Sequence, residues 1–191
     1  MKRPTAFEKK LNEFVPLPQE VSDKVMSYTK VKTFSRKELL LEPGQVCDYV
    51  YFVEKGLART YYVKNGKEFT TDIYIDDEFL GEFLSYFSRA PSQQYLELIE
   101  DSELSYIHFE DLQKLYDEFP IMERVGRLVA EYHYVLLSEH TYRLKFGSTR
   151  ERYEELFNRK VEVIRRAPIG VIASYLGMSI ENLSRIRRKI Q

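Results

Sequence analysis

The spacing of apolar residues changes twice along the chain, and each change marks a change of predicted secondary structure. Between residues 5 and 29 apolar side chains recur at helical spacing, interrupted by Pro16 and Pro18. From about residue 31 to residue 108 they alternate with polar residues in short runs rich in β-branched and aromatic side chains, which is the pattern of strands. After residue 108 the helical spacing returns. The chain therefore predicts helices, then a β domain, then a second helical part.

About eight short strands are predicted, and turn-forming residues separate them. Asn65 and Gly66 lie between two of the runs and predict a tight hairpin, because a type I′ turn needs positive φ at both central residues. Many short strands at regular spacing imply an antiparallel barrel or sandwich. The clearest runs are residues 31–34, 38–42, 49–53, 57–63, 69–75, 95–99 and 103–108.

A long helix is predicted after Pro120, which ends a short helix over residues 109–119. It runs about 24 residues to Lys145, with only Gly126 as a breaker. A helix of this length carries more apolar surface than a small barrel covers, so we expect it to pack against its copy in a homodimer. The alternative is that it packs only on its own domain. The predicted dimer interface consists of Ile121, Val125, Leu128, Val129, Tyr132 and Leu136.

The net charge of −1 conceals a strong asymmetry between the two ends of the chain. Residues 143–191 contain 12 Lys and Arg against five Glu, a balance of +7, so residues 1–142 hold 17 basic and 25 acidic residues, a balance of −8. A basic module joined to an acidic one suggests that the C-terminal part binds a polyanion. The alternative is a solvated helical surface without such a partner.

The composition limits the class of protein further. No apolar run approaches the roughly 20 residues that span a bilayer, and the N-terminal sequence lacks the apolar segment of a secretory signal. Cys47 is the only cysteine, so neither an internal disulfide nor a four-cysteine metal site can form within one chain. We expect a cytoplasmic protein with no membrane partner and no metal.

Residues 168–190 carry the features of a helix-turn-helix. Ala173 is small where two helices would cross, and Gly177 lies where the turn needs a left-handed backbone. Ser179 is placed to cap the second helix by accepting from a backbone N–H near Asn182. The alternative is an ordinary helical hairpin with a basic surface. The predicted apolar faces contain Ile172, Leu176, Leu183, Ile186 and Ile190.

The second helix of this motif is the predicted DNA-binding element. Arginine can bridge guanine O6 and N7, glutamate can accept from cytosine N4, and Asn182 can pair with adenine. Arg187 and Lys189 are better placed for phosphates, which set affinity and register, and so in part is Arg188. The predicted DNA-binding residues are Ser179, Ile180, Glu181, Asn182, Arg185 and Arg188.

The order of barrel, long helix and helix-turn-helix resembles the Crp/Fnr superfamily of transcription regulators over essentially the whole chain. Residues 39–45 and 51–59 are similar to the family's first jelly-roll strands and glycine turns, and residues 77–83 to its Gly-Glu segment. The resemblance implies an α+β fold: an N-terminal antiparallel β jelly-roll barrel with flanking helices, a long dimerisation helix and a C-terminal helical helix-turn-helix domain. It also implies a homodimer that binds a palindromic operator.

The effector pocket implied by the resemblance departs from that of cyclic-nucleotide binders. Those have Arg-Ser or Arg-Thr about ten residues after Gly-Glu to grip the cyclic phosphate, whereas this chain has Ser92 and Gln93 there. An anionic ligand then lacks a guanidinium fork, an interaction on the order of several kcal/mol in a partly buried site. Arg89 is the nearest replacement. The candidate pocket residues are Gly81, Glu82, Phe83, Arg89, Ser92 and Gln93.

Aromatic residues crowd the same region, and they either form core or bind a small apolar or aromatic ligand. They are Tyr74, Phe79, Phe83, Tyr86, Phe87 and Tyr95. The three histidines, His108, His133 and His140, are interpreted as surface or core residues.

We therefore expect a sequence-specific, homodimeric DNA-binding transcription regulator whose pocket does not bind cyclic nucleotides. The alternatives are a cyclic-nucleotide-responsive regulator and a barrel-based small-molecule-binding protein. No cluster of His, Cys, Asp or Glu has metal or nucleophile spacing, so we expect neither an enzyme nor a cofactor. The predicted domains are a sensor barrel over residues 1–120, a dimerisation helix over 121–146 and a DNA-binding domain over 147–191. Expected partners are duplex DNA, a second copy of the chain, RNA polymerase and an effector of unknown identity.

Overall fold

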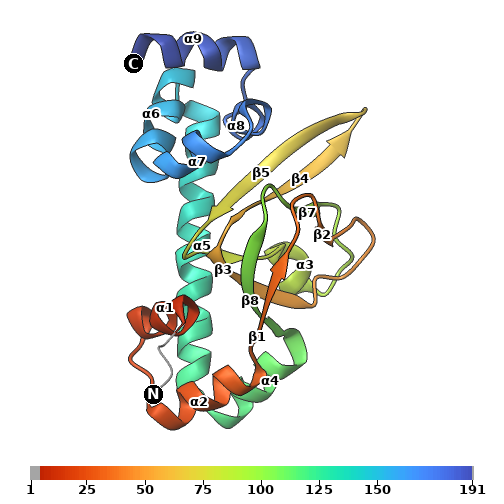
Figure 1. Cartoon of the computed structure of the whole chain (residues 1–191), viewed down its shortest axis with the longest axis vertical. Helices are drawn as coiled ribbons and strands as arrows, with labels where there is room; N and C mark the ends of the chain where they lie inside the picture. Colours follow the sequence, from red (N-terminus) through yellow and green to blue (C-terminus); the bar gives the residue numbers. More distant parts are fainter. Residues whose placement is uncertain (1–4, 191) are drawn as a thin grey trace.

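The computed structural model describes residues 5–190, with the side chain of residue 190 excepted, so the apolar contact expected of Ile190 lies outside the described part. A β barrel lies beside one long helix, and a bundle of short helices lies at the far end of that helix (Figure 1). The α+β fold and its element order are confirmed. The boundaries of the three predicted domains stay a prediction. None of the described helices is long and apolar enough to cross a membrane.

The barrel consists of two four-stranded antiparallel sheets, in the orders β1-β8-β3-β6 and β2-β7-β4-β5. Asn65 and Gly66 have φ of +53° and +72°, which confirms the predicted tight turn between β4 and β5. The strands are β1 (Lys30–Phe34), β2 (Leu39–Leu41), β3 (Tyr49–Lys55), β4 (Leu57–Lys64), β5 (Lys67–Ile75), β6 (Phe79–Leu80), β7 (Tyr95–Leu98) and β8 (Ser102–His108).

The inner faces of both sheets bury apolar side chains, as the two-residue period requires. These include Tyr51, Val53, Ala58, Tyr74, Leu80, Leu96, Leu98 and Leu104, which are buried and form one cluster. The short helix α3 (Phe83–Ser88) follows β6 and lies across one opening of the barrel.

Strand β5 contains a β-bulge beside the barrel wall. Thr60 pairs with Asp72 and Tyr61 pairs with Thr70, so Thr71 is the extra residue. A bulge bends the strand, increases its twist and re-aims the side chains around it. Beyond the bulge the β4–β5 hairpin extends away from the barrel toward the C-terminal helices (Figure 1).

Helices α1 (Ala6–Phe14), α2 (Gln19–Tyr28) and α4 (Phe109–Glu118) pack around the lower end of the barrel and of the long helix (Figure 1). Thr5 caps α1 by accepting from the amide of Glu8 at 3.1 Å. Glu54 of β3 accepts from the amide of Ala6 at 3.0 Å. The break at Pro16 and Pro18 separates α1 from α2 as predicted.

The long helix α5 (Pro120–Phe146) begins with its proline at the first position, where the missing N–H costs nothing. Its first half packs on its own barrel and on α1 and α4, with Met122 and Val125 buried there. A Cβ on Gly126 would lie 2.3 Å from the hydroxyl of Tyr116, so glycine allows α4 to approach this closely.

This packing corrects part of the predicted dimer interface. Val125 is only 2% exposed within its own chain, because Phe7, Leu11 and their neighbours cover it. Ile121, Leu128, Val129 and Leu136 are half-buried on the same side, and Tyr132 packs edge-on against Phe14. Val125 therefore belongs to the core of its own chain, whereas the role of Ile121, Leu128, Val129, Tyr132 and Leu136 in a dimer interface stays a prediction.

The C-terminal helices are α6 (Thr149–Arg159), α7 (Val161–Arg166), α8 (Ile169–Tyr175) and α9 (Ile180–Ile190). Ser148 and Glu151 form a capping box that starts α6 after α5 ends. A small core holds the four helices together and contains Tyr153, Leu156, Val163, Ile164, Ile172, Ala173, Leu176 and Leu183.

Polar contacts fasten this helical module to strand β5 of the barrel. The hydroxyl of Ser174 on α8 accepts from the amide of Thr70 at 2.8 Å and donates to the carbonyl of Glu68 at 3.1 Å. Lys160, between α6 and α7, donates to Glu78 and to the carbonyl of Ile73, each at 2.8 Å. The barrel and the C-terminal helices are thus joined directly, and not only through α5.

Candidate nucleic-acid interface and sensor cavity

Helices α8 and α9 form the predicted helix-turn-helix. The turn places Gly177 at φ +61°, where a Cβ would also lie 3.0 Å from a guanidinium nitrogen of Arg152. The Met178 amide donates to the Ala173 carbonyl at 3.0 Å and closes the turn. Ser179 accepts from the Asn182 amide at 3.2 Å, which confirms the predicted cap. Buried Ala173 and Leu183 hold the two helices together.

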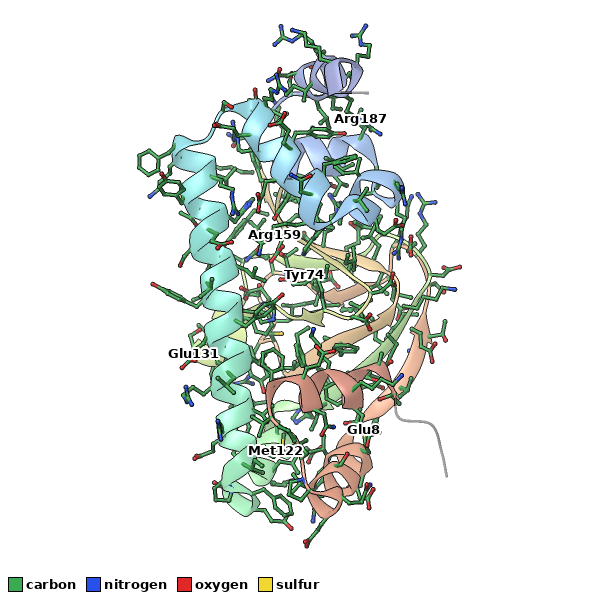
Figure 2. The ribbon with its side chains drawn as sticks, turned by 90° about the vertical axis from the view of Figure 1, so that its left-hand side faces the viewer. Glu8, Tyr74, Met122, Glu131, Arg159 and Arg187 are labelled. Carbon is green, nitrogen blue, oxygen red and sulfur yellow. The ribbon has the colours of Figure 1, made fainter. Side chains whose placement is uncertain are left out.

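One face of α9 is exposed and basic. Leu183 and Ile186 point into the module, whereas Glu181, Arg185 and Arg188 are exposed on the other side. Arg185 donates to the Asn182 side chain at 2.9 Å, so the two groups stand next to each other on that face. The predicted residues Ser179 and Ile180 are exposed at the start of the helix. Helix α9 lies at the end of the molecule opposite α2 (Figure 1), and its outer side carries nitrogen-tipped side chains near the labelled Arg187 (Figure 2).

The other basic residues of the module are largely used inside the protein. Arg159 pairs with Glu139 and Glu155, Lys160 with Glu78, and Arg166 with Asp76 and Glu100. In contrast, Arg185, Arg187, Arg188 and Lys189 make no ion pair with any described residue. The positive charge that is left for a polyanion is therefore concentrated on α9.

A second candidate site is a cavity of about 830 Å³ between the barrel, α3 and α5. Figure 2 labels two of its lining residues, Tyr74 of β5 and Met122 of α5. Phe79, Phe83, Phe87 and Tyr116 also line it, so most of its wall is apolar or aromatic. A volume of this size is in the ordinary range for a small-molecule site.

A short polar chain crosses one wall of this cavity. The bulge residue Thr71 bonds through its hydroxyl to Thr60 at 2.9 Å and to the Gln94 side chain at 2.5 Å. Gln94 in turn donates to Glu82 at 3.3 Å. The other carboxylate oxygen of Glu82 caps α3 by accepting from the Ser85 amide at 2.9 Å. Glu82 is thus buried and held by neutral donors.

The six predicted pocket residues do not all meet at this cavity. Gly81, Glu82 and Phe83 line it, and the Gly81 carbonyl accepts from Tyr74 at 3.3 Å. Ser92 and Gln93 are outside the lining: Ser92 bonds the backbone of Gln94 through its hydroxyl, and Gln93 is exposed. Gln94, one residue further on, occupies the wall instead.

Arg89 also points away from the cavity. Its guanidinium pairs with Asp48, donates to the Cys47 carbonyl at 3.0 Å and lies 4.0 Å from the ring centre of Phe109. The residue has φ +57° at the C-terminal end of α3, and it is absent from the lining of the cavity. Among the described lining residues there is no Lys or Arg.

Two lining residues carry unsatisfied polar atoms: His133, which the sequence analysis interpreted as a surface or core residue, and Tyr86, which it placed among the aromatic residues of core or ligand site. Nε2 of His133 and the hydroxyl of Tyr86 are buried, and neither has a hydrogen-bond partner among the described residues. Burial, and to a lesser degree Lys160, lowers the pKa of His133 to about 4, so its ring is neutral near pH 7. The helical spacing of Met122, Val129 and His133 was the available signal, because it puts all three on one face of α5.

The outer face of α5 carries a second apolar stripe in its C-terminal half. Tyr134 is 70% exposed and Leu137 is 62% exposed, and Leu144 continues the row. With Ala130 and Thr141 these positions are spaced by four, three, four and three residues, which is the repeat of a coiled-coil seam. Glu131, on the same outer side, points away from the barrel in Figure 2. Tyr134, Leu137, Thr141 and Leu144 are exposed, whereas Ala130 is half-buried, and Ala130, Tyr134 and Leu137 also contribute to the lining of the cavity.

Comparison with known proteins shows what the barrel and the overall fold resemble. Residues 31–119 match the family model of the cyclic nucleotide-binding domain. No curated protein sequence matches the chain significantly. Among the described residues, no group of three His, Cys, Asp or Glu lies close enough together to hold a metal ion.

Solved structures resemble nearly the whole chain. FixK2 from Bradyrhizobium japonicum matches with a TM-score of 0.71 at 18% identity, over 85% of this chain and 84% of FixK2. The c-di-GMP responsive global regulator CLP from Xanthomonas campestris matches with a TM-score of 0.64 at 18% identity, over 91% of this chain and 92% of CLP. The catabolite activator protein of Thermus thermophilus matches with a TM-score of 0.58 at 21% identity, over 95% of this chain and 86% of that protein. The resemblance to the Crp/Fnr superfamily is thereby confirmed for the fold.

Proposed function

We propose that this chain, which has the fold of Crp/Fnr-type regulators, is a sequence-specific DNA-binding transcription regulator. The observation that carries the proposal is the exposed face of α9. Arg185 and Arg188 stand there without an acidic partner among the described residues, while Arg150, Arg159, Lys160, Arg165 and Arg166 of the preceding helices pair with carboxylates. Glu181, Asn182 and Arg185 supply groups that recognise base edges, and Arg187 and Lys189 supply charge for phosphates.

The active form in this proposal is a homodimer that binds a palindromic operator. The outer stripe of α5, which comprises Ala130, Tyr134, Leu137, Thr141 and Leu144, is the proposed contact between the two copies. Its coiled-coil spacing and its exposure support that role, since exposed apolar rows of this length are uncommon in monomers. The face with Val125 contributes to each copy's own core instead.

The barrel is the proposed sensor domain, within residues 1–120, followed by the dimerisation helix and the DNA-binding domain over residues 147–191. We propose that its cavity does not bind cyclic nucleotides, because Arg89 is tied to Asp48 and the lining holds Glu82 without a cation beside it. The match of residues 31–119 to the cyclic nucleotide-binding domain favours the second candidate, a cyclic-nucleotide-responsive regulator. Action in the cytoplasm with RNA polymerase belongs to either proposal.

Selection of duplexes from a random pool by the purified full chain tests the DNA-binding function. We expect enrichment of an inverted repeat whose half-sites lie about one helical turn apart, with affinity that falls steeply as salt rises. Retention of DNA without any enriched sequence would reduce the activity to unspecific polyanion binding and contradict the proposal.

A further inference from the structure

The cavity beside α3 and α5 contains hydrogen-bonding groups that the protein itself does not satisfy. Tyr86 is only 3% exposed, and its hydroxyl has no partner among the described residues. Nε2 of His133 is buried in the same way. A buried polar group without a partner costs free energy, and such groups in a native protein call for a specific explanation. Both residues line the cavity, so a bound molecule there can supply the missing partners.

The surroundings of these two groups are aromatic. The ring of Phe83 lies 4.6 Å from the His133 ring, and Phe87 lies 5.4 Å from Tyr86 and 6.0 Å from Phe83, measured between ring centres. Leu84 and Phe87 are exposed at the side where α3 approaches α5, which gives the cavity an opening. Apolar walls with a few polar groups are typical of sites for small organic molecules.

The charges at the cavity wall disfavour an ionised ligand. Asp72 and Glu82 are the acidic lining residues, and the lining contains no Lys or Arg among the described residues. Both carboxylate oxygens of Glu82 already accept from neutral donors, and burial raises the pKa of Asp72 although Lys160 opposes the shift. His133 is neutral, since its pKa is lowered to about 4. An anion would meet acidic groups in a medium that screens charge poorly. A cation would lose its hydration, while Glu82 has both oxygens occupied and burial disfavours the ionised form of Asp72.

We propose that this cavity binds an uncharged, largely aromatic small molecule that carries one hydrogen-bonding oxygen, with Tyr86 and His133 as its polar contacts. Tyr86 can donate its hydroxyl proton to the ligand oxygen. Nε2 of the neutral imidazole can either donate or accept, depending on which ring nitrogen carries the proton. That the ligand acts as an effector rests on the proposed function, whereas its binding does not depend on DNA.

Calorimetry on the full chain without DNA tests the proposal with four probes of similar size. The probes are 1-naphthylmethanol, 1-methylnaphthalene, 1-naphthoate and 1-naphthylmethylammonium. We expect 1-naphthylmethanol to bind saturably at one site per chain, about tenfold more tightly than 1-methylnaphthalene, which cannot satisfy the buried groups. The two ions should bind more weakly than the alcohol. The proposal is overturned if the alcohol does not bind, or if either ion binds more tightly.

Variants locate the contacts. Tyr86→Phe and His133→Phe keep the aromatic bulk. Each should therefore weaken the binding of 1-naphthylmethanol severalfold and leave the affinity for 1-methylnaphthalene unchanged. Tyr142→Phe removes an exposed hydroxyl outside the cavity and should change neither probe. Leu112→Trp, on α4 at the lining and outside the proposed seam, should weaken the binding of both probes by filling space. Thermal unfolding of each variant checks that it folds. If the alcohol binds the two cavity variants as it binds the original protein, the assigned contacts are wrong, whatever the DNA experiment has shown.

Discussion

Arg166 of α7 and Asp76, at the end of β5, form an ion pair in which the guanidinium Nη1 lies 2.5 Å from the carboxylate Oδ2. Arg166 also donates to the carbonyl of Gly56 at 2.7 Å and pairs with Glu100. One side chain therefore contacts three separate segments of the barrel. Asp76 in turn accepts from the Gly56 amide at 2.6 Å. The C-terminal helices are thereby fixed to the barrel at the corner where β5 ends.

Substitution of this aspartate should loosen the attachment measurably. D76N removes the charge but keeps the shape, and we expect the free energy of unfolding at pH 7 to fall by about 1 kcal/mol, because the pair is partly exposed to solvent. Urea denaturation measures the loss. E162Q is the matched control, since Glu162 pairs with Arg165 only at the exposed surface of α7 and should change stability by less than half as much.

The same pair sets a pH dependence with a definite sign. Burial alone would raise the pKa of Asp76, but the hydrogen bonds from Arg166 and Gly56 outweigh it and lower the pKa. Stability from this group is therefore complete above the unfolded pKa, about 4, and is lost as pH falls through the lower folded value. The difference between the original protein and D76N should shrink below pH 4. A difference that stays constant down to pH 2 would show that the charge is not its source.

Arg185→Ala should alter base preference more than overall affinity for DNA. If Arg185 contacts a base edge, its removal costs about 1–3 kcal/mol at one position of each half-site and leaves other sequences little affected. Binding to a panel of single-base operator variants measures the effect. Lys189→Ala is the control that should weaken all sequences alike and reduce the salt dependence. Uniform weakening by Arg185→Ala would assign that residue to a phosphate.

Leu137→Glu should convert the homodimer to monomers. The substitution puts two carboxylates across the proposed seam on a surface that is 62% exposed in one copy, so the fold of each copy should survive. Sedimentation at micromolar concentration measures the assembly. Val31→Glu, on β1 where Val31 is 48% exposed, should stay dimeric. Val125→Glu is unsuitable, because it buries a charge in the protein's own core and should unfold it. An original protein that sediments as a monomer would exclude the proposed seam.

Neither cyclic AMP nor cyclic GMP should bind at micromolar concentration. The cyclic phosphate would find carboxylates at the wall, and Arg89 would have to leave Asp48 and the ring of Phe109 to reach it. Calorimetry with the full chain checks the expectation. Saturable binding that Arg89→Ala abolishes would show that the arginine does move, and would favour the cyclic-nucleotide-responsive alternative.

The sequence predicted those features that depend on local rules. The Asn65–Gly66 turn, the cap at Ser179 and the glycine at the turn before α9 all follow from backbone preferences of single residues. The exposure of Arg185 and the burial of Leu183 follow from helical periodicity. These features could be located without knowing what the helices pack against.

The cavity wall and the α5 seam depend on tertiary contacts, and there the sequence misled. Counting residues from Gly81 and Glu82 pointed to Ser92 and Gln93, but the loop between α3 and β7 places Gln94 at the cavity wall instead. Val125 and Leu137 are both apolar residues of one helix, and only the position of α1 and α4 decides which is covered. Arg89 was expected near the ligand, but it pairs with Asp48, which is far from it in sequence and beside it in space.

The bulge at Thr71 makes the length of β5 as important as its composition. The extra residue bends the strand where it leaves the barrel, and the hairpin beyond it runs to α8, where the Thr70 amide meets Ser174 (Figure 1). We expect a replacement such as Thr71→Ser to keep the extra residue and with it the bend, whereas deletion of Thr71 would restore regular pairing and redirect the hairpin. Deletion of this single residue should thus alter the direction of the β4–β5 hairpin more than a substitution there.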